Sequence, residues 1–256
     1  MKKLLSSLLL LSLWAMAINF TFDGRVQWAK YLAELGFIQK KANDADYNAT
    51  SYITRAELTA IALKFAWEKI PEPYTCKKYF VDVTKNDWIC AAVEKAADIG
   101  LINRNNKNFY PQNQITRPEA IALVLKSSGL DRKIPANISS FEDPEVAFVP
   151  NGWDIQTWLK KRTQGYTPST KIVLVDILDW RFSTFQKALY AGIIDVSFTM
   201  PENGRHKENY QKYKSYYNNN QIYSFWEDFF IFRGDAFIIF GEAYKKMQMM
   251  SAEATI

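Results

Sequence analysis

Hydrophobic positions recur with a helical period after two similar segments of the chain. Both segments read Ile-Thr-Arg-x-Glu, the first at residues 53–57 and the second at residues 115–119, and a run of mostly apolar residues follows each. A threonine followed three residues later by a glutamate is typical of a capping box, in which each side chain bonds the other's backbone N–H. We therefore predict two helix starts, one capped by Thr54 with Glu57 and the other by Thr116 with Glu119.

A second amphipathic pattern, ended by a glycine, precedes these helix starts. Residues 87–102 begin with Asp-Trp, contain a Lys-Ala pair and finish with a glycine followed by two apolar residues. Residues 179–194 repeat this pattern, and residues 28–38 repeat its second half. Glycine adopts the left-handed conformation at a helix C-terminus at little cost. The pattern predicts helices that stop at Gly36, Gly100 and Gly192, each leading through a polar loop to a second helix start.

The third of these helix starts, at residues 231–239, is degenerate. Arg233 and Asp235 stand where an arginine and a glutamate stand in the two earlier segments, but Phe232 replaces the capping threonine. This segment therefore departs most from the pattern, and a helix start without its cap is less stable. The apolar residues 172–175, which lie between the second and third helix starts, fit a short strand.

We interpret the chain as three helix-loop-helix repeats, the third expanded by insertions. The fold class we predict is mainly α, with short strands or loops at most. The expected boundaries of the three repeats are residues 18–72, 73–133 and 134–246, and a tail follows at 247–256.

Residues 1–17 have the features of a secretory signal peptide. Lys2 and Lys3 supply the charged region, an apolar stretch follows, and Ala15 and Ala17 form an Ala-x-Ala cleavage site. An uncleaved anchor is the alternative, although the apolar run is short for a membrane span. We expect an exported protein with no membrane span after cleavage.

The net charge and the cysteine content of the chain limit the kinds of partner that we expect. The formal net charge is +5, of which two charges lie in the signal segment, so the chain is mildly biased toward anionic partners and far less basic than a nucleic-acid binder. Cys76 and Cys90 are the two cysteines. Outside the cytoplasm they can form a disulfide, and two buried thiols are the alternative. Without a CxxC or Cys/His set, we expect neither a metal nor a cofactor.

The arginine of each segment is not explained by helix stability. A cation in the first turn faces the positive end of the helix dipole, which is unfavourable. A guanidinium grips a carboxylate bidentately, and a helix N-terminus adds free N–H donors, so an anion is expected there. The alternative is that Arg55 and Arg117 pair with an acidic residue of a neighbouring repeat. A ligand that displaces such a resting salt bridge combines both interpretations.

These motifs resemble the signature of S-layer homology repeats. The resemblance rests on the doubled Ile-Thr-Arg-x-Glu box, the Phe-x-Asp entries at Phe80 and Phe141, the Trp-led helix that ends in glycine, and the Phe-x-Pro turn at Phe109. It implies three repeats with pseudo-threefold symmetry around a small helical bundle, with grooves between neighbouring repeats. It also implies binding to anionic cell-wall glycan, a secondary wall polymer or peptidoglycan, and therefore a secreted protein located at the cell wall or cell surface. The ligand contacts that it implies are Arg55, Arg117 and, less directly, Arg233.

The chain departs from the family where a second glycine often brings backbone close to sugar. Lys40, Arg104 and Val196 occupy these positions here. Two of them are cationic, so Lys40 and Arg104 are candidates for contacts with a different glycan. We expect two working sites, built on Arg55 and Arg117, and a third that is altered or silent.

Two tryptophans occupy matching helix positions, Trp88 and Trp180. We predict that they anchor the core, because most such residues are buried, and sugar stacking is the alternative. No catalytic motif is recognisable, so we do not expect an enzyme. A second hypothesis is a surface scaffold whose inserts, with Trp153, Trp158 and residues 210–220, bind another protein.

Overall fold

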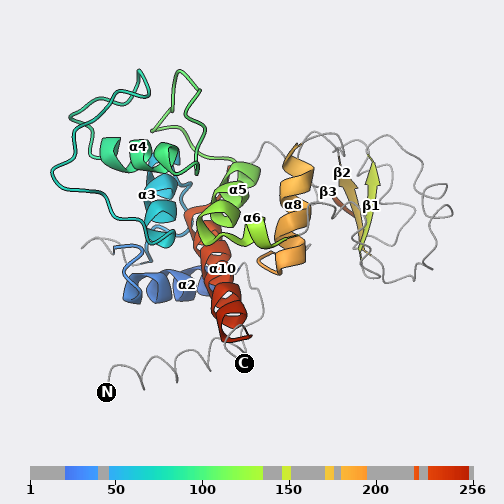
Figure 1. The fold of residues 1–256 in the computed structure, drawn as a ribbon. Helices are drawn as coiled ribbons and strands as arrows, with labels where there is room; N and C mark the ends of the chain where they lie inside the picture. The colour runs from blue at the N-terminus through green and yellow to red at the C-terminus, as the bar shows by residue number, and fades with distance from the viewer. Residues whose placement is uncertain are drawn as a thin grey trace, which may run out of the picture.

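The computed structural model describes residues 21–39, 46–134, 146–150, 171–175, 180–194, 222–224 and 230–253. The predicted signal segment, Lys40, Val196, the tryptophans at 153 and 158 and the polar insert at 210–220 lie outside these ranges. Most of the described chain is helical, which confirms the mainly α prediction (Figure 1). The helices are α2 (Phe22–Glu34), α3 (Arg55–Phe65), α4 (Cys90–Asp98), α5 (Arg117–Ser128), α6 (Leu130–Lys133), α8 (Trp180–Ala191) and α10 (Arg233–Glu253).

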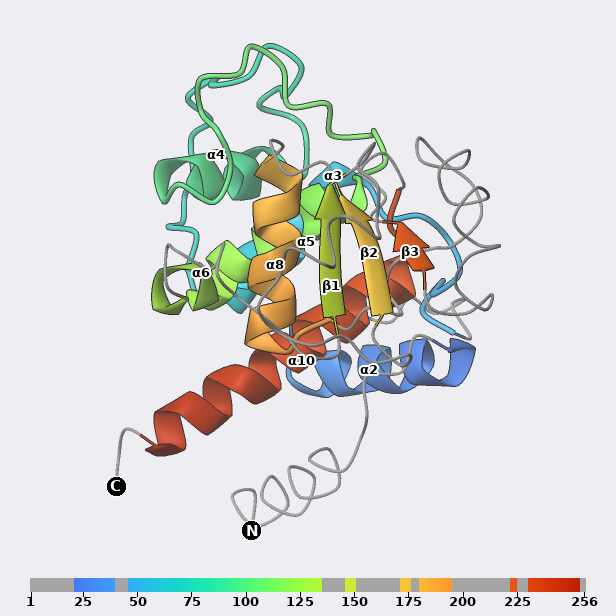
Figure 2. The same cartoon turned by 90° about the vertical axis from the view of Figure 1, so that its right-hand side faces the viewer.

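Three short strands form a parallel sheet in the order β1-β2-β3. They are β1 (Val146–Pro150), β2 (Lys171–Val175) and β3 (Ile222–Ser224), and β2 contains the short strand predicted at residues 172–175. All three come from the segments predicted as insertions in the third repeat. The sheet lies beyond α8, on the side of the helices that faces the viewer in Figure 2.

A closed ring of backbone hydrogen bonds brings the three predicted helix starts together. The N–H of Ile53 donates to the carbonyl of Ile231 (3.3 Å), the N–H of Ile231 to the carbonyl of Ile115 (3.0 Å), and the N–H of Ile115 back to Ile53 (3.2 Å). All three isoleucine side chains are buried. Each helix start therefore faces the next in a cyclic order, so residues of one reach residues of another.

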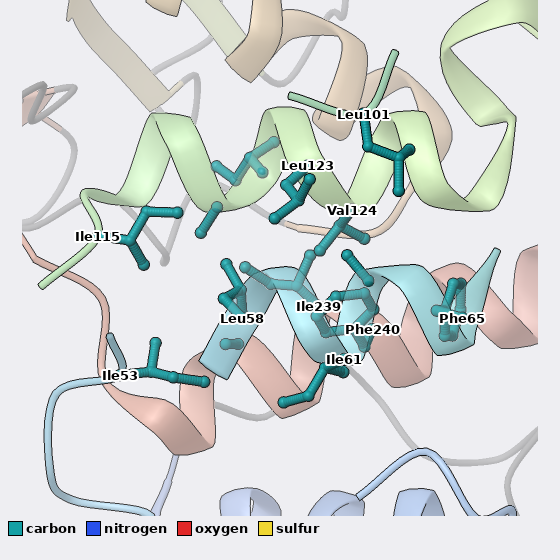
Figure 3. Close-up of a cluster of buried hydrophobic side chains, with 14 of the residues drawn as sticks. Ile53, Leu58, Ile61, Phe65, Leu101, Ile115, Leu123, Val124, Ile239 and Phe240 are labelled. Atoms are coloured by element: carbon teal, nitrogen blue, oxygen red, sulfur yellow. The ribbon is translucent and has the colours of Figure 1, made fainter. Parts of the chain in front are cut away.

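The core lies where the second helices of these units meet. Figure 3 shows side chains of α3, α5 and α10 pointing toward one another, among them Leu58, Leu123 and Phe240. α10 is apolar almost all round in its first half, as expected of a helix with neighbours on several sides. Its closest packing is against α2, which lies across it.

The helices before each loop stop at glycines. Gly36, Gly100 and Gly192 have φ angles of 82°, 77° and 70°, a left-handed conformation that glycine adopts without strain. The apolar residues directly after these glycines then turn back into the core, where Phe37, Leu101 and Ile193 are buried. Burial of these side chains holds the beginning of each loop against the core.

The loop between the first two units is held by side chains rather than by regular structure. Cys76 and Cys90 form a disulfide, and the buried carboxylate of Glu94 accepts hydrogen bonds from the Tyr74 hydroxyl (3.1 Å) and from the N–H groups of Lys77 (2.6 Å) and Tyr79 (3.1 Å). These three acidic and sulfur groups are the cluster that most resembles a metal site in the described chain. Because the sulfurs bond each other and Glu94 is satisfied, the cluster is structural.

Candidate functional site

Each box arginine pairs with the acidic residue of another box. The guanidinium of Arg55 lies 3.0 Å from a carboxylate oxygen of Glu119, and that of Arg233 lies 2.9 Å from Glu57. Arg117 completes the cycle with Asp235, at 3.8 Å. The structure therefore contains the resting salt bridges of the alternative interpretation.

The capping boxes position the acidic members of these pairs. Glu57 accepts a hydrogen bond from the Thr54 N–H (3.0 Å), and its own N–H donates to the Thr54 hydroxyl (3.2 Å). Glu119 accepts hydrogen bonds from the N–H and the hydroxyl of Thr116 (3.0 Å each). Each carboxylate is thus fixed at a helix start, with an oxygen facing an arginine from another unit.

Two grooves open beside two of the three pairs. Groove 1 has a volume of about 380 Å³ and contains the Arg233–Glu57 pair, whereas groove 2 has a volume of about 1000 Å³ and contains the Arg55–Glu119 pair. Corresponding positions of the two units line both grooves. They are Ile38 and Ile102 after the glycine stops, Tyr47 and Phe109 in the loops, Lys64 and Lys126 on the second helices, and Trp88 and Trp180 at the rims.

The lysines give both grooves an excess of positive charge. Lys64 and Lys126 are exposed and lie on the helices that carry Glu57 and Glu119. In each groove the acidic residue already faces an arginine, so the lysine adds a cation without an acidic counterpart on the groove wall. Sequence reasoning missed both lysines, although they stand at the same spacing after the box arginine.

The two tryptophans are not core anchors, which corrects our prediction. Trp88 is 66% exposed and Trp180 is 55% exposed. Trp88 lies two residues before α4 and Trp180 is the first residue of α8, and each lines a groove, while Ile89 and Phe185 take the buried positions of these segments. A wide aromatic ring beside cationic groups is a surface on which a sugar ring can stack.

The third pair, Arg117 with Asp235, is largely buried and is contacted by α2. The side chain of Arg117 is only 9% exposed and that of Asp235 only 1%, against 25% for Arg55 and 19% for Arg233. Arg25 of α2 donates to Asp235 at 2.7 Å. Arg117 is not among the described residues that line either groove, whereas Arg233 lines groove 1. Our expectation of a working site at Arg117 stays a prediction, because residues 195–221 of the third unit lie outside the described chain.

Glycines on α10 permit this closure. A Cβ atom at Gly241 would collide with the ring of Trp28, and one at Gly234 would lie within 2.7 Å of Arg25 side-chain carbons. At the position of the groove lysines, α10 has Glu242, which pairs with Lys245 (2.9 Å). Among the described residues, the third unit therefore has close packing and an acidic side chain at the positions that face a groove in the other two.

The remaining cationic candidate that the structure describes lies away from the grooves. Arg104 stacks on the ring of Tyr79, 4.0 Å from its centroid, and approaches Asp98 at 3.9 Å. It is not among the residues that line groove 2. The role of Lys40 stays a prediction, because that residue lies outside the described chain.

The Glu57 carboxylate of groove 1 makes the stability of the fold depend on pH. Burial raises the pKa of the Glu57 carboxyl, but the Thr54 hydrogen bonds and the Arg233 charge outweigh it, so the net pKa is lowered. A lowered carboxyl pKa in the folded state contributes stability above the unfolded value, near 4.5, and this contribution is lost as the pH falls.

We therefore expect Glu57→Gln to lower the free energy of unfolding by about 1 kcal/mol at pH 7 and by less at pH 3. Urea unfolding at both pH values measures this difference. The control is Glu72→Gln, which changes an exposed carboxylate. An equal loss at both pH values would show that the Glu57 charge contributes nothing.

Comparison with known proteins identifies part of this architecture. Residues 79–121, from the loop before α4 into α5, match the S-layer homology domain family. Over 108 residues the chain is 33% identical to the exoglucanase XynX of Acetivibrio thermocellus, covering 41% of this chain and 10% of that protein. It is 35% identical over 109 residues to endo-1,4-beta-xylanase A of Thermoanaerobacterium saccharolyticum, covering 41% of this chain and 9% of that protein.

A third relative is named as a surface layer protein. The surface layer protein of Brevibacillus choshinensis is 27% identical over 107 residues, which cover 41% of this chain and 10% of that protein. The chain therefore spans about a tenth of the length of the relatives that it matches, and the two glycanases resemble it over that small segment only. The S-layer homology resemblance is confirmed, while the number of repeats stays a prediction.

Proposed function

We propose that this chain, which carries an S-layer homology domain, binds anionic cell-wall polysaccharide non-covalently through grooves 1 and 2. Such binding holds an exported protein at the cell surface. The observation that carries the proposal is the repetition of one constellation, an arginine, a carboxylate, a lysine and an exposed tryptophan, in two grooves. The relatives fit this role, because two glycanases and a surface layer protein have the shared segment in common.

The groove chemistry suits an acidic sugar. The guanidinium offers several N–H donors, of which Glu57 or Glu119 uses only part, so a ligand carboxylate can share the arginine or displace the glutamate. Lys64 or Lys126 supplies the second cation that compensates the added negative charge. The tryptophan at the rim covers the apolar face of the sugar ring.

The described residues give no support for a catalytic role. The relatives that are named as enzymes match over a tenth of their length or less. Among the described helices, none is long and apolar enough to cross a membrane. A binding role at the surface therefore accounts for more of the observations than an enzymatic one. The proposed protein partner of the inserts stays a prediction, because those residues lie outside the described chain.

Co-sedimentation with purified wall sacculi tests this function. The chain without its predicted signal segment should sediment with untreated sacculi and stay in solution when the acidic polymer has been stripped from them. High salt should weaken the interaction, because charged groups carry it. Equal binding to stripped and untreated sacculi would contradict recognition of an acidic polymer.

The exposed tryptophans provide a test of sugar stacking. Trp88→Ala and Trp180→Ala each remove a largely exposed ring, so we expect the free energy of unfolding to change by less than about 1 kcal/mol. A tryptophan that contacts a ligand often contributes about 2 kcal/mol, so in the double variant the affinity of each groove for the wall polymer should fall roughly thirtyfold. Trp67→Ala is the control, since Trp67 is exposed but lines neither groove. Unchanged affinity in the double variant would rule out stacking.

A further inference from the structure

A long irregular segment carries the tryptophan of groove 1. Residues 66–89 connect the end of α3 to the start of α4 and contain no helix or strand (Figure 1). Loops of this length without regular structure are uncommon in compact domains and often serve a function. Among the described residues that line groove 1, Trp88 alone comes from the second unit. Its place at the groove therefore depends on how the end of this segment is held.

The helix that follows Trp88 begins without a capping side chain. Ile89 stands at the N-cap of α4, where it offers no side-chain hydrogen bond, and the first turn contains no acidic residue. By contrast, α3 and α5 begin with the capping boxes of Thr54 and Thr116. The first turn of an uncapped helix has free N–H groups and frays easily. Because Trp88 is largely exposed, its own packing adds little to hold it in place.

A disulfide anchors this helix start instead. Cys90 is the first residue of α4, two positions after Trp88, and it is buried. Its bond to Cys76, with a Cα–Cα distance of 6.3 Å, ties the first turn of α4 to an earlier part of the segment. That part is itself held to α4, because the N–H of Lys77 donates to Glu94 at 2.6 Å. Trp88 therefore lies inside the closed loop, within about 7 Å of chain from its fixed end.

The tryptophan of groove 2 has no such cross-link. Trp180 is the first residue of α8, and the sequence contains no cysteine besides Cys76 and Cys90. The two grooves thus share an arginine, a carboxylate, a lysine and a tryptophan but differ in how the tryptophan is held. Groove 2 is therefore an internal control for any effect of the disulfide on groove 1.

We propose that the Cys76–Cys90 disulfide is a positioning element of groove 1, which holds the start of α4 so that Trp88 stays at the rim. This inference rests on the proposed function, in which Trp88 contacts the glycan. When a binding-competent arrangement is populated only part of the time, the apparent affinity falls by that fraction. Loss of the disulfide therefore weakens groove 1, by at most the amount lost when the Trp88 ring itself is removed, and leaves groove 2 unchanged.

The test isolates groove 1 in the Arg55→Ala background, in which groove 2 has lost its arginine. The probe is a short fragment of the purified acidic wall polymer. Cys76→Ala removes the cross-link and leaves Cys90 packed in the core, and titration calorimetry should give about five- to tenfold weaker binding in this variant. In the Arg233→Ala background, which isolates groove 2, Cys76→Ala should change the affinity by less than about twofold.

A double-mutant cycle shows whether the disulfide acts through Trp88. Effects of two residues that act through one another are not additive. In an Arg55→Ala chain that already carries Trp88→Ala, Cys76→Ala should therefore weaken groove 1 by less than about twofold more. A further five- to tenfold loss there would overturn the inference, because the disulfide would then affect groove 1 by another route.

A matched variant separates positioning from general stability. Cys76→Ala should lower the Tm by about 6–12 °C, because the cross-link closes a short loop. Leu130→Ala truncates a buried residue that lines neither groove, so it should lower the Tm by a similar amount and leave the affinity of both grooves within about twofold. A loss at groove 1 in Leu130→Ala equal to that in Cys76→Ala would overturn the positioning role.

Reduction provides a measurement without a substitution. Dithiothreitol reduces the Cys76–Cys90 bond to two thiols as it is itself oxidised to its cyclic disulfide. The reduced Arg55→Ala chain should show the same weakening of groove 1 as the Cys76→Ala variant.

The inference and the proposed function fail in different ways. Equal losses at both grooves, or unchanged affinity of groove 1 without the disulfide, overturn the positioning role and leave the proposed function intact. Failure of the unaltered chain to bind the polymer fragments or wall sacculi overturns both.

Discussion

Replacing both groove arginines with alanine, Arg55→Ala together with Arg233→Ala, is expected to reduce binding to wall sacculi by at least about a hundredfold. Each arginine is the permanently charged donor of its groove, and removal of one partner of a charge-assisted contact typically costs about 2–5 kcal/mol. A loss of 1.4 kcal/mol is tenfold in affinity, so each groove loses at least about thirtyfold, and the two losses multiply where one polymer occupies both grooves. Co-sedimentation over a concentration series measures the effect.

A matched control separates this loss from a change in net charge. Arg104→Ala with Arg132→Ala removes the same number of charges from exposed arginines that line neither groove. This variant should bind within about threefold of the unaltered chain, because distant exposed charges are screened. Equal losses in both double variants would mean that net charge, rather than the grooves, determines binding.

Replacing Asp235 with alanine is expected to lower the free energy of unfolding by about 3–5 kcal/mol. Asp235 is the acidic partner of Arg25, at 2.7 Å, and of Arg117, at 3.8 Å, and its side chain is almost fully buried. Without it, Arg25 and Arg117 lose the carboxylate that both of them contact. Removal of one partner of a buried ion pair is among the most destabilising substitutions.

Urea unfolding measures the loss, and Glu119→Ala is the matched control. Glu119 pairs with Arg55 at a similar place in its own helix, but its side chain is 30% exposed, so water can compensate Arg55. We expect a loss of about 1 kcal/mol for this variant. If both variants lost the same amount, the distinction between a closed and an open pair would not hold.

The capping boxes and glycine stops could be predicted because they depend on residues a few positions apart. Thr54 and Glu57 meet within one helical turn whatever surrounds them, and Gly100 ends α4 through its own backbone conformation. The predicted strand at residues 172–175 was also recognisable from a short apolar run.

The state of each arginine could not be predicted, because it depends on packing between units. Arg117 belongs to a box with its capping pair intact, yet it is the buried one, since Asp235 beside it also pairs with Arg25 of α2, whose side chain packs against Gly234. The degenerate box instead places Arg233 in a groove. The presence of the capping residues in a box therefore did not indicate whether its arginine lines a groove.

The tryptophans illustrate the same limit. Trp88 lies two residues before α4 and Trp180 begins α8, and both helices have apolar positions that fit a buried face. That the two tryptophans are exposed depends on how these helices pack against the neighbouring units, which the local pattern does not show. The groove lysines were visible in the sequence as a repeated spacing. Without the neighbouring unit, however, nothing distinguished them from ordinary surface residues.

The number of acidic oligosaccharides bound by each chain tests the central claim most directly. Titration calorimetry with short fragments of the purified acidic wall polymer should give two sites in the unaltered chain. One site should remain in Arg55→Ala or in Arg233→Ala, and none in the double variant. Three sites in the unaltered chain, or two sites retained in the double variant, would contradict binding through grooves 1 and 2.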